Sequence, residues 1–300
     1  MSKLPFSLPG RFYRGNIHTH STRSDGALDP VAVATAYREA GYDFLAITDH
    51  FLAQYGFPIT DTREFRTDSF TTLLGAELHA PRLENGQLWH IVAVGLPLDF
   101  APTAPSETAM ELARRAAAAG AFIGIAHPAW YGLTLDDVRS LDVAHAIEIY
   151  NETCFALNDR GESWYVADLL LSRGHRYFAY AADDAHFLPT RPDACAAWIQ
   201  LRAESLAPES LLAALKAGQF YSSQGPEIHD VQIDARRLRV SCSPVAHVYL
   251  SGKAPLARQI HGTDITTCEF SLEPFGDSYA RITVIDEHGK RAWSNPFWPD

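Results

Sequence analysis

The sequence lacks several features of secreted and membrane proteins. Only four cysteines occur among 300 residues, and none belongs to a C-x-x-C pair, so we interpret Cys154, Cys195, Cys242 and Cys268 as reduced thiols. No segment has the roughly 18 consecutive apolar residues of a membrane span. Residues 1–11 lack the basic and apolar stretches of a signal peptide. We therefore expect a cytoplasmic protein that has no membrane partner.

Positive charge is also scarce. The chain has 25 Lys and Arg against 36 Asp and Glu, which gives a formal net charge of −11. Such a surface repels long polyanions, because neutralising their phosphates requires clustered Lys and Arg. We expect no extended nucleic acid as a partner. A small anionic substrate stays compatible with this charge, since bound cations dominate the local field of a metal site.

The first three quarters of the chain predict an α/β fold. Helical patterns separate short apolar runs with little alternation, which is typical of parallel β/α units whose strands are buried on both faces. One such helix begins at Asp29-Pro30 and ends at Gly41. The other expected helices are Ser106–Ala119, Glu162–Arg173 and Pro208–Ala217. The expected strands are Tyr13–His18, Phe44–Thr48, Thr72–Leu78, Trp89–Gly95, Phe122–Ala126, Ala146–Tyr150, Tyr177–Ala182 and Ala196–Leu201.

The pattern changes after Gly225-Pro226. Short alternating runs follow, separated by turn residues, and no helical period is present. We predict a hydrolase domain over residues 1–225 and a small antiparallel β module over residues 226–300. The expected strands of the module are Val231–Ile233, Leu238–Cys242, Val245–Leu250, Thr267–Leu272 and Ala280–Ile285.

Thirteen histidines are present, and several stand where a predicted strand ends. His18 and His20 have the i, i+2 spacing that puts two side chains on one face of a strand, so both imidazoles can reach one ion. Asp25 follows on a polar loop that could fold back over the metal. Asp49 and His50 come directly after an apolar run. In β/α barrels, the carboxyl ends of the strands form the active-site rim.

Glu77 is the most informative single residue. It stands inside an apolar strand, where a carboxylate is costly unless it is paired or bound to a metal. Its two oxygens could bridge two ions. His79 shares its face, and we interpret it either as a spare ligand or as a histidine of the pocket wall.

Further candidates stand at other strand boundaries. His90 opens one apolar run, His127 follows another, and Asp184 and His186 repeat the i, i+2 spacing, with Asp183 as a partner that could orient a histidine. Nine candidate ligands exceed what one tetrahedral zinc needs, and a mixed histidine and carboxylate set suits Zn, Mn or Fe. We therefore predict two or three divalent ions. Their ligands would be His18, His20, Asp25, His50, Glu77, His90, His127, Asp184 and His186.

Other residues are candidates for substrate binding. Arg23 and Arg191 flank the motifs and could clamp a phosphate or carboxylate, or could be solvated loop arginines. Trp130 and Tyr131 follow His127 and could wall an apolar leaving-group pocket or pack in the core.

The order of the motifs over about residues 14–190 resembles that of the polymerase and histidinol phosphatase (PHP) superfamily. The resemblance implies a distorted (β/α)7 barrel, a centre of two or three metals and phosphoester hydrolysis. Some members have a histidine where this chain has Asp25. The motifs that carry the resemblance are His18-x-His20, Asp25-Gly26, Ile47-Thr48-Asp49-His50, Gly75-Ala76-Glu77, His90, Ala126-His127-Pro128 and Asp184-Ala185-His186.

A narrower likeness covers nearly the whole chain. It resembles the carbaryl-hydrolase-like branch, which includes an enzyme that cleaves an aryl carbamate. The segments that carry it are Glu148-Ile149-Tyr150-Asn151, Trp164, Ala181-Ala182-Asp183-Asp184-Ala185-His186, Trp198 and Arg291-Ala292-Trp293-Ser294-Asn295-Pro296.

The sequence thus favours a phosphoesterase that hydrolyses a small phosphate ester or nucleotide by a metal-bound hydroxide. The candidate catalytic residues are Glu77, Asp49 and His50. Glu77 would hold two ions, which lower the pKa of their shared water. A histidine or Asp49 would protonate the leaving oxygen. The alternatives are a metal-dependent carbamate or ester hydrolase and a non-catalytic metal-binding protein.

Overall fold

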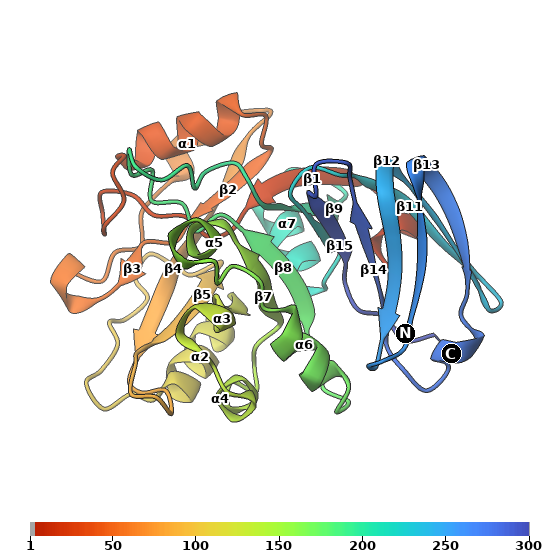
Figure 1. Cartoon of the computed structure of the whole chain (residues 1–300). Helices are drawn as coiled ribbons and strands as arrows, with labels where there is room; N and C mark the ends of the chain where they lie inside the picture. The colour runs from red at the N-terminus through yellow and green to blue at the C-terminus, as the bar shows by residue number, and fades with distance from the viewer. Residues whose placement is uncertain (1–3, 300) are drawn as a thin grey trace.

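A single mixed sheet runs through the computed structural model, which describes residues 4–299 (Figure 1). Its main path has the order β11-β12-β14-β15-β10-β9-β1-β2-β4-β5-β6-β7-β8, and β3 and β13 join it at its sides. The strands are β1 (Arg11–Asn16), β2 (Phe44–Ile47), β3 (His50–Phe51), β4 (Thr71–Ala80), β5 (Trp89–Val94), β6 (Phe122–Ile125), β7 (Ala146–Asn151), β8 (Phe178–Ala182), β9 (Trp198–Ala203), β10 (Phe220–Ser223), β11 (Ile228–Asp234), β12 (Arg237–Gly252), β13 (Ala257–Ser271), β14 (Ala280–Ile285) and β15 (Arg291–Ser294).

Helices cover the half of the sheet formed by β1 to β8 (Figure 1). The side chain of Asp29 accepts a hydrogen bond from the backbone N–H of Ala32, so the first helix begins where the sequence predicts. Thr108 starts the second helix with a capping box, slightly after the expected start. The helices are α1 (Pro30–Glu39), α2 (Ala109–Ala118), α3 (Pro128–Tyr131), α4 (Leu135–Ser140), α5 (Glu152–Asn158), α6 (Trp164–Leu171) and α7 (Pro208–Lys216).

The direction of β5 differs from the expected parallel β/α pattern. β5 is antiparallel to both of its neighbours, β4 and β6, whereas β1, β2 and β4 are parallel to one another, as are β6, β7 and β8. No helix separates β4 from β5, so the chain returns without a crossover. The start of β5 therefore lies at the edge where the parallel strands end.

The expected distorted (β/α)7 barrel is not confirmed over the described residues, because the sheet does not close. β1 is parallel to β2 on one side, but β9 occupies its other side as an antiparallel partner. Since that edge of β1 is filled, β1 does not pair with β8, and contact is made instead between the segments that follow these two strands. There the backbone N–H of Asp184 donates to His18 O over 2.8 Å, and that of His20 donates to Ala185 O over 2.9 Å. The α/β class is confirmed, and the sheet is open.

The tail forms antiparallel strands, as expected, but its last strand, β15, was not predicted, and the other strands differ from the prediction in two places. The two runs predicted over residues 238–250 form one long strand, β12, with irregular register near residues 241–247. β13 begins at Ala257, well before the predicted Thr267. The buried side chains of this region form their own cluster, which also includes Phe6 and Tyr221. The sheet continues across residue 225, because β15 pairs with β10. The division into two domains there stays a prediction.

Between residues 4 and 299, no helix is long and apolar enough to cross a membrane.

Candidate metal centre

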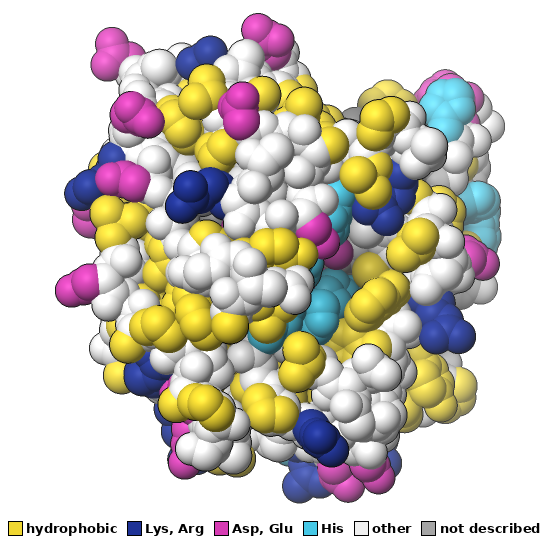
Figure 2. Space-filling model, turned by 90° about the vertical axis from the view of Figure 1, so that its left-hand side faces the viewer, with side chains coloured by type: hydrophobic (Ala, Val, Ile, Leu, Met, Phe, Trp, Pro, Cys, Tyr) yellow, Lys and Arg dark blue, Asp and Glu magenta, His cyan; other side chains and the backbone are white. Residues whose placement is uncertain are grey.

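The nine predicted ligands converge at one edge of the sheet, and His79 joins them. Figure 2 shows histidine side chains gathered in a hollow of this face, bordered by hydrophobic side chains. The strand directions explain the convergence. The ends of β1, β6 and β8 carry five of the residues, and the start of the antiparallel β5 brings His90 to the same edge. The side chains that group there are His18, His20, Asp25, His50, Glu77, His79, His90, His127, Asp184 and His186.

Glu77 lies at the centre of the group and is fully buried. Its Oε1 atom faces one set of histidines. That oxygen is 2.8 Å from His90 Nδ1, 3.2 Å from His127 Nε2 and 3.5 Å from His18 Nε2. One carboxylate oxygen therefore has three imidazole nitrogens around it.

The Oε2 atom of Glu77 faces a second set. It is 2.6 Å from His50 Nδ1, 3.6 Å from His20 Nε2 and 3.8 Å from His79 Nε2. His79 is buried, and its Nδ1 lies 3.1 Å from Trp89 O, which leaves Nε2 directed at the cluster. The two oxygens of Glu77 thus address two different groups of nitrogen atoms, as a bridging carboxylate must.

Asp184 supplies a second buried carboxylate. Its Oδ1 atom is 2.9 Å from His20 Nε2 and 3.3 Å from His18 Nε2. Its backbone has a φ of +55°, and His127 has a φ of +26°. Non-glycine residues adopt such angles at a cost, and these outliers cluster at functional sites.

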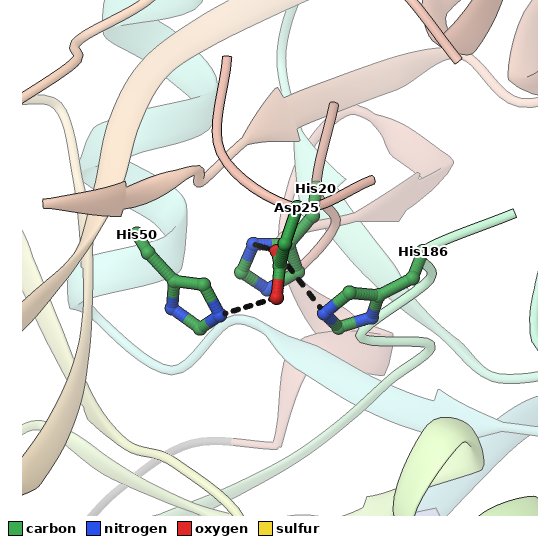
Figure 3. Close-up of side chains that lie close together, drawn as sticks. All are labelled: His20, Asp25, His50 and His186. Atoms are coloured by element: carbon green, nitrogen blue, oxygen red, sulfur yellow. Dashed lines mark ion pairs between the residues drawn. The ribbon is translucent and has the colours of Figure 1, made fainter. Parts of the chain in front are cut away.

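Asp25 forms the outer part of the group, with His20, His50 and His186 around it (Figure 3). Its Oδ2 atom is 3.4 Å from His50 Nε2, and its Oδ1 atom is 3.4 Å from His186 Nε2 and 3.9 Å from His20 Nδ1. The Asp25 side chain is 40% exposed, whereas Glu77 is fully buried. This outer position is therefore the one nearest to solvent.

Glu148 is part of a segment that carries the narrower resemblance, but it was not predicted as a site residue. It is fully buried in β7, and its Oε1 atom is 2.9 Å from His18 Nδ1. Its Oε2 atom accepts hydrogen bonds from the backbone N–H of His127 over 2.7 Å and from Asn151 Nδ2 over 3.0 Å. A carboxylate on one ring nitrogen orients a histidine so that the other nitrogen can bind a metal. The signal was present, because Glu148 interrupts an apolar strand as Glu77 does.

Several buried atoms of the cluster have no well-aligned hydrogen-bond partner among residues 4–299, although Glu77 Oε2 lies 2.6 Å from His50 Nδ1. They are His18 Nε2, Glu77 Oε2 and His127 Nδ1. An unsatisfied buried polar atom costs about 1–3 kcal/mol, so three at one place need a compensating partner. Divalent cations that accept nitrogen and oxygen ligands would satisfy these lone pairs, so the residues present fit a metal centre.

The carboxylates and histidines also perturb one another's protonation. Burial alone would lower the pKa of His18, but Asp184 and Glu148 raise it well above its usual value. Burial likewise opposes the charged form of His50, yet Glu77 and Asp25 raise the pKa of its imidazole to about 11.

The remaining imidazoles shift in the opposite direction. Burial together with His50 and His186 lowers the pKa of His20 to about 4. Burial and then neighbouring histidines also lower the pKa of His79. Without a metal, the cluster thus mixes protonated and neutral imidazoles, and a bound cation would take the place of the protons.

The structure gives Asp49 a different position from that expected of a general acid. Its buried carboxylate accepts hydrogen bonds from Ser21 N over 2.7 Å, from the hydroxyls of Ser21 and Ser24 over 2.8 Å each, and from Thr60 Oγ1 over 3.0 Å. It does not line the pocket. These bonds hold the loop that carries Asp25. Asp49 was predicted as catalytic because it follows a strand beside His50, and loop partners cannot be read from that spacing.

Asp183 does not orient a histidine in this structure. Its buried carboxylate accepts a hydrogen bond from the hydroxyl of Tyr37 over 2.7 Å. It also accepts bonds from the backbone N–H groups of Cys195, Ala196 and Ala197 at 2.7–2.9 Å. Asp183 therefore ties the end of β8 to α1 and to the segment before β9.

A pocket of about 250 Å³ opens over the cluster. Of the predicted substrate-binding residues, Trp130 and Arg191 line it, whereas Arg23 is exposed and lies outside the lining. Tyr131 is buried and packs against the rings of His90 and His127. The lining residues are Asp25, His50, His90, His127, Trp130, Thr153, Cys154, Leu157, Asp184, His186, Leu188 and Arg191.

The fold is similar to that of a solved protein from Bacteroides vulgatus, described as a two-domain protein that contains a predicted PHP-like metal-dependent phosphoesterase. The likeness covers 97% of this chain and 98% of that chain, with a TM-score of 0.51 and 14% sequence identity. At this identity, the likeness concerns the fold. It extends over both the helix-covered half of the sheet and the tail.

Two further structures match shorter parts of the chain. A candidate metal-dependent phosphoesterase from Bifidobacterium adolescentis covers 68% of this chain and 96% of its own, with 14% identity and a TM-score of 0.47. An amidohydrolase from Chromobacterium violaceum, solved with sulfate and no metal, covers 57% and 87%, with 16% identity and a TM-score of 0.40. No protein-family model matches the sequence. No curated protein matches it either.

Proposed function

We propose that the protein is a metal-dependent phosphoesterase of the PHP superfamily that acts on a small anionic phosphate ester. One observation carries the proposal: the two oxygens of the buried Glu77 face two separate sets of histidine nitrogens, and Glu77 Oε2 and His18 Nε2 lack a well-aligned hydrogen-bond partner among the described residues. When two or more divalent ions are bound, they lower the pKa of water and neutralise charge on a phosphate.

The residues form four overlapping groups that could each hold an ion. The two fully buried groups are His18, His127 and Asp184, and His18, His20 and Glu77. The other two are His50, Glu77, His79 and His90, and His20, Asp25, His50 and His186. His18, His20, His50 and Glu77 each belong to two groups, which favours closely spaced ions. Mn, Zn and Fe all accept such ligands.

The pocket favours a small substrate. Among the described residues, Arg191 is the only Lys or Arg side chain in its lining, and Nε of Arg191 donates to Asp193 Oδ2 over 2.8 Å. Its terminal nitrogens could bind a phosphate oxygen beside the ions. Asp49 is outside the pocket and bonded to a loop, so it would not protonate the leaving group, and the pocket-lining histidines are candidate metal ligands.

An activity screen on Mn-loaded and Zn-loaded protein tests the proposal. The substrates are p-nitrophenyl phosphate, bis-p-nitrophenyl phosphate and an aryl carbamate. We expect phosphate release that disappears in Glu77→Gln. Cleavage of the carbamate with no cleavage of either phosphate would contradict it.

Carbamate or ester hydrolysis is the second candidate. Trp130, Leu157 and Leu188 give the pocket an apolar wall that suits an aryl leaving group, and the same metal ligands could serve that reaction. Arg191 favours the phosphate, because a neutral carbamate offers this cation no charge to pair with.

A further inference from the structure

The walls of the pocket differ in chemistry from its floor. The floor consists of the metal-ligand side chains, whereas the walls come from α3, α5 and the segment after β8. Leu157 is 55% exposed and Leu188 is 37% exposed, and both line the pocket beside Trp130. Covering solvent-exposed apolar side chains at the border of a pocket with an apolar ligand group is favourable, because it removes apolar surface from water.

These walls are fixed elements of the fold. The side chain of Asn151 caps α5 by accepting a hydrogen bond from Cys154 N over 2.8 Å. The hydroxyl of Thr153 donates to Asp184 O over 2.7 Å, and its backbone N–H donates to Asp183 O over 2.9 Å. The helix that carries Leu157 is therefore attached to the end of β8, beside the metal ligands.

The walls offer few groups that could recognise a sugar or a nucleobase. The hydroxyl of Thr153 lies within hydrogen-bond distance of Asp184 O and Asp193 Oδ2, so internal partners already engage it. Burial raises the pKa of the Cys154 thiol, so it stays neutral and is a weak donor. A polyhydroxylated group would lose its water here without replacement, and each unpaired polar group costs free energy.

We infer that the substrate is an amphiphilic phosphomonoester, whose phosphate lies between the metal centre and Arg191 and whose aryl or alkyl group covers Trp130, Leu157 and Leu188. This inference rests on the proposed function and narrows it, because it disfavours nucleotides and sugar phosphates. The volume of about 250 Å³ admits a single ring or a short chain and is below the roughly 300–1,000 Å³ typical of pockets for drug-sized ligands.

Binding of two phosphonates to the Mn-loaded protein tests the inference without requiring turnover. Benzylphosphonate and methylphosphonate share the anionic group and differ in the apolar one. By calorimetry, we expect benzylphosphonate to bind about tenfold more tightly, which corresponds to about 1.4 kcal/mol. Leu157→Gln should reduce its affinity about fivefold, as expected for partial burial of one leucine, and leave methylphosphonate unchanged. Tyr165→Gln is the control, because Tyr165 is 78% exposed and lies outside the pocket lining.

The outcomes distinguish failure of the apolar subsite from failure of phosphate recognition. Tight but equal binding of both phosphonates would overturn the apolar subsite and leave phosphoester recognition in place. An equal loss of benzylphosphonate affinity in Leu157→Gln and Tyr165→Gln would also overturn it. If neither phosphonate binds, phosphate recognition itself fails, and the inference fails with it.

Discussion

Histidines gather in two places in this molecule, and the two groups differ in one decisive respect. In the tail, His247 on β12 lies opposite His261 on β13, with 2.6 Å between their Nδ1 atoms. Neither forms an ion pair with a carboxylate among the described residues, and His261 is exposed. At the sheet edge, by contrast, the histidines surround the buried carboxylates Glu77 and Asp184.

The comparison shows that nearby imidazoles alone do not make a metal centre. The half-buried His247 and the exposed His261 can share a proton or turn toward water, so nothing in their surroundings requires a cation. The buried carboxylates have no such escape, because removing their charge from water is costly unless a cation compensates it. The difference can be tested in four ways: by replacing the carboxylate Glu77, by replacing Glu148 beside His18, by varying the pH, and by replacing the two tail histidines.

Glu77→Gln should have the largest effect. Gln preserves the shape of the side chain but loses the charge, so the ions should bind weakly and turnover should fall by several orders of magnitude. Metal content, melting temperature and turnover are measured on one preparation. If Glu77 served only as a buried ion-pair partner, the variant would be less stable but would keep its metal and its activity.

Glu148→Gln should have a smaller effect of the same kind. The variant loses the carboxylate charge that lies 2.9 Å from His18 Nδ1, and with it the acceptor best suited to a protonated ring nitrogen. Loss of such an outer partner typically reduces metal affinity about 10–100-fold. Competition with a chromogenic chelator measures the affinity. An affinity equal to that of the wild type would show that Glu148 does not act through His18.

The pH dependence of metal binding should follow the raised pKa values of His18 and His50. The raised pKa values favour the cationic imidazolium form of both histidines at neutral pH in the metal-free protein, and a metal binds only the neutral ring. Affinity should therefore increase with pH, and binding at pH 7 should release protons. Calorimetry in buffers of different ionisation enthalpy measures the release. Absence of any proton release would contradict the protonation of these histidines.

The same shift affects the stability of the metal-free protein. The pKa of His50 is raised in the folded state to about 11, from 6.5, so protonation favours folding. That contribution is fully present below pH 6.5 and is lost as the pH rises toward 11. The metal-loaded protein should not show this loss, because its His50 is already neutral. Thermal melts of both forms across this range make the comparison.

His247→Ala with His261→Ala should have the smallest effect. Metal content and turnover should remain at the wild-type level, since this pair lacks a carboxylate partner among the described residues. A loss of one metal equivalent in the double variant would show that the tail binds a metal.

Local chemistry made most of the candidate site predictable from the sequence. Most ligand motifs follow, open or interrupt an apolar strand, and such polar residues stand out in the sequence wherever the strand lies in the sheet. His90 was predicted correctly to belong with the others in space, although its strand runs in the opposite direction. An apolar run reads the same in either direction, so the sequence could not show that β5 is antiparallel.

Long-range pairing accounts for what the sequence did not show. Whether β1 takes β8 or β9 as its neighbour depends on the competition between two distant strands, and neither run encodes that choice locally. The partners of Asp49 come from two loops, at Ser21–Ser24 and Thr60, which no spacing rule connects. Glu148 could have been found, because a buried carboxylate in an apolar strand is the same signal that identified Glu77.

Anomalous diffraction from crystals of the Mn-loaded protein tests the central claim most directly. The account predicts two or three manganese peaks at the edge of the sheet, with the two oxygens of Glu77 bound to different ions. A single ion that does not contact Glu77, or manganese bound only at His247 and His261, would contradict it.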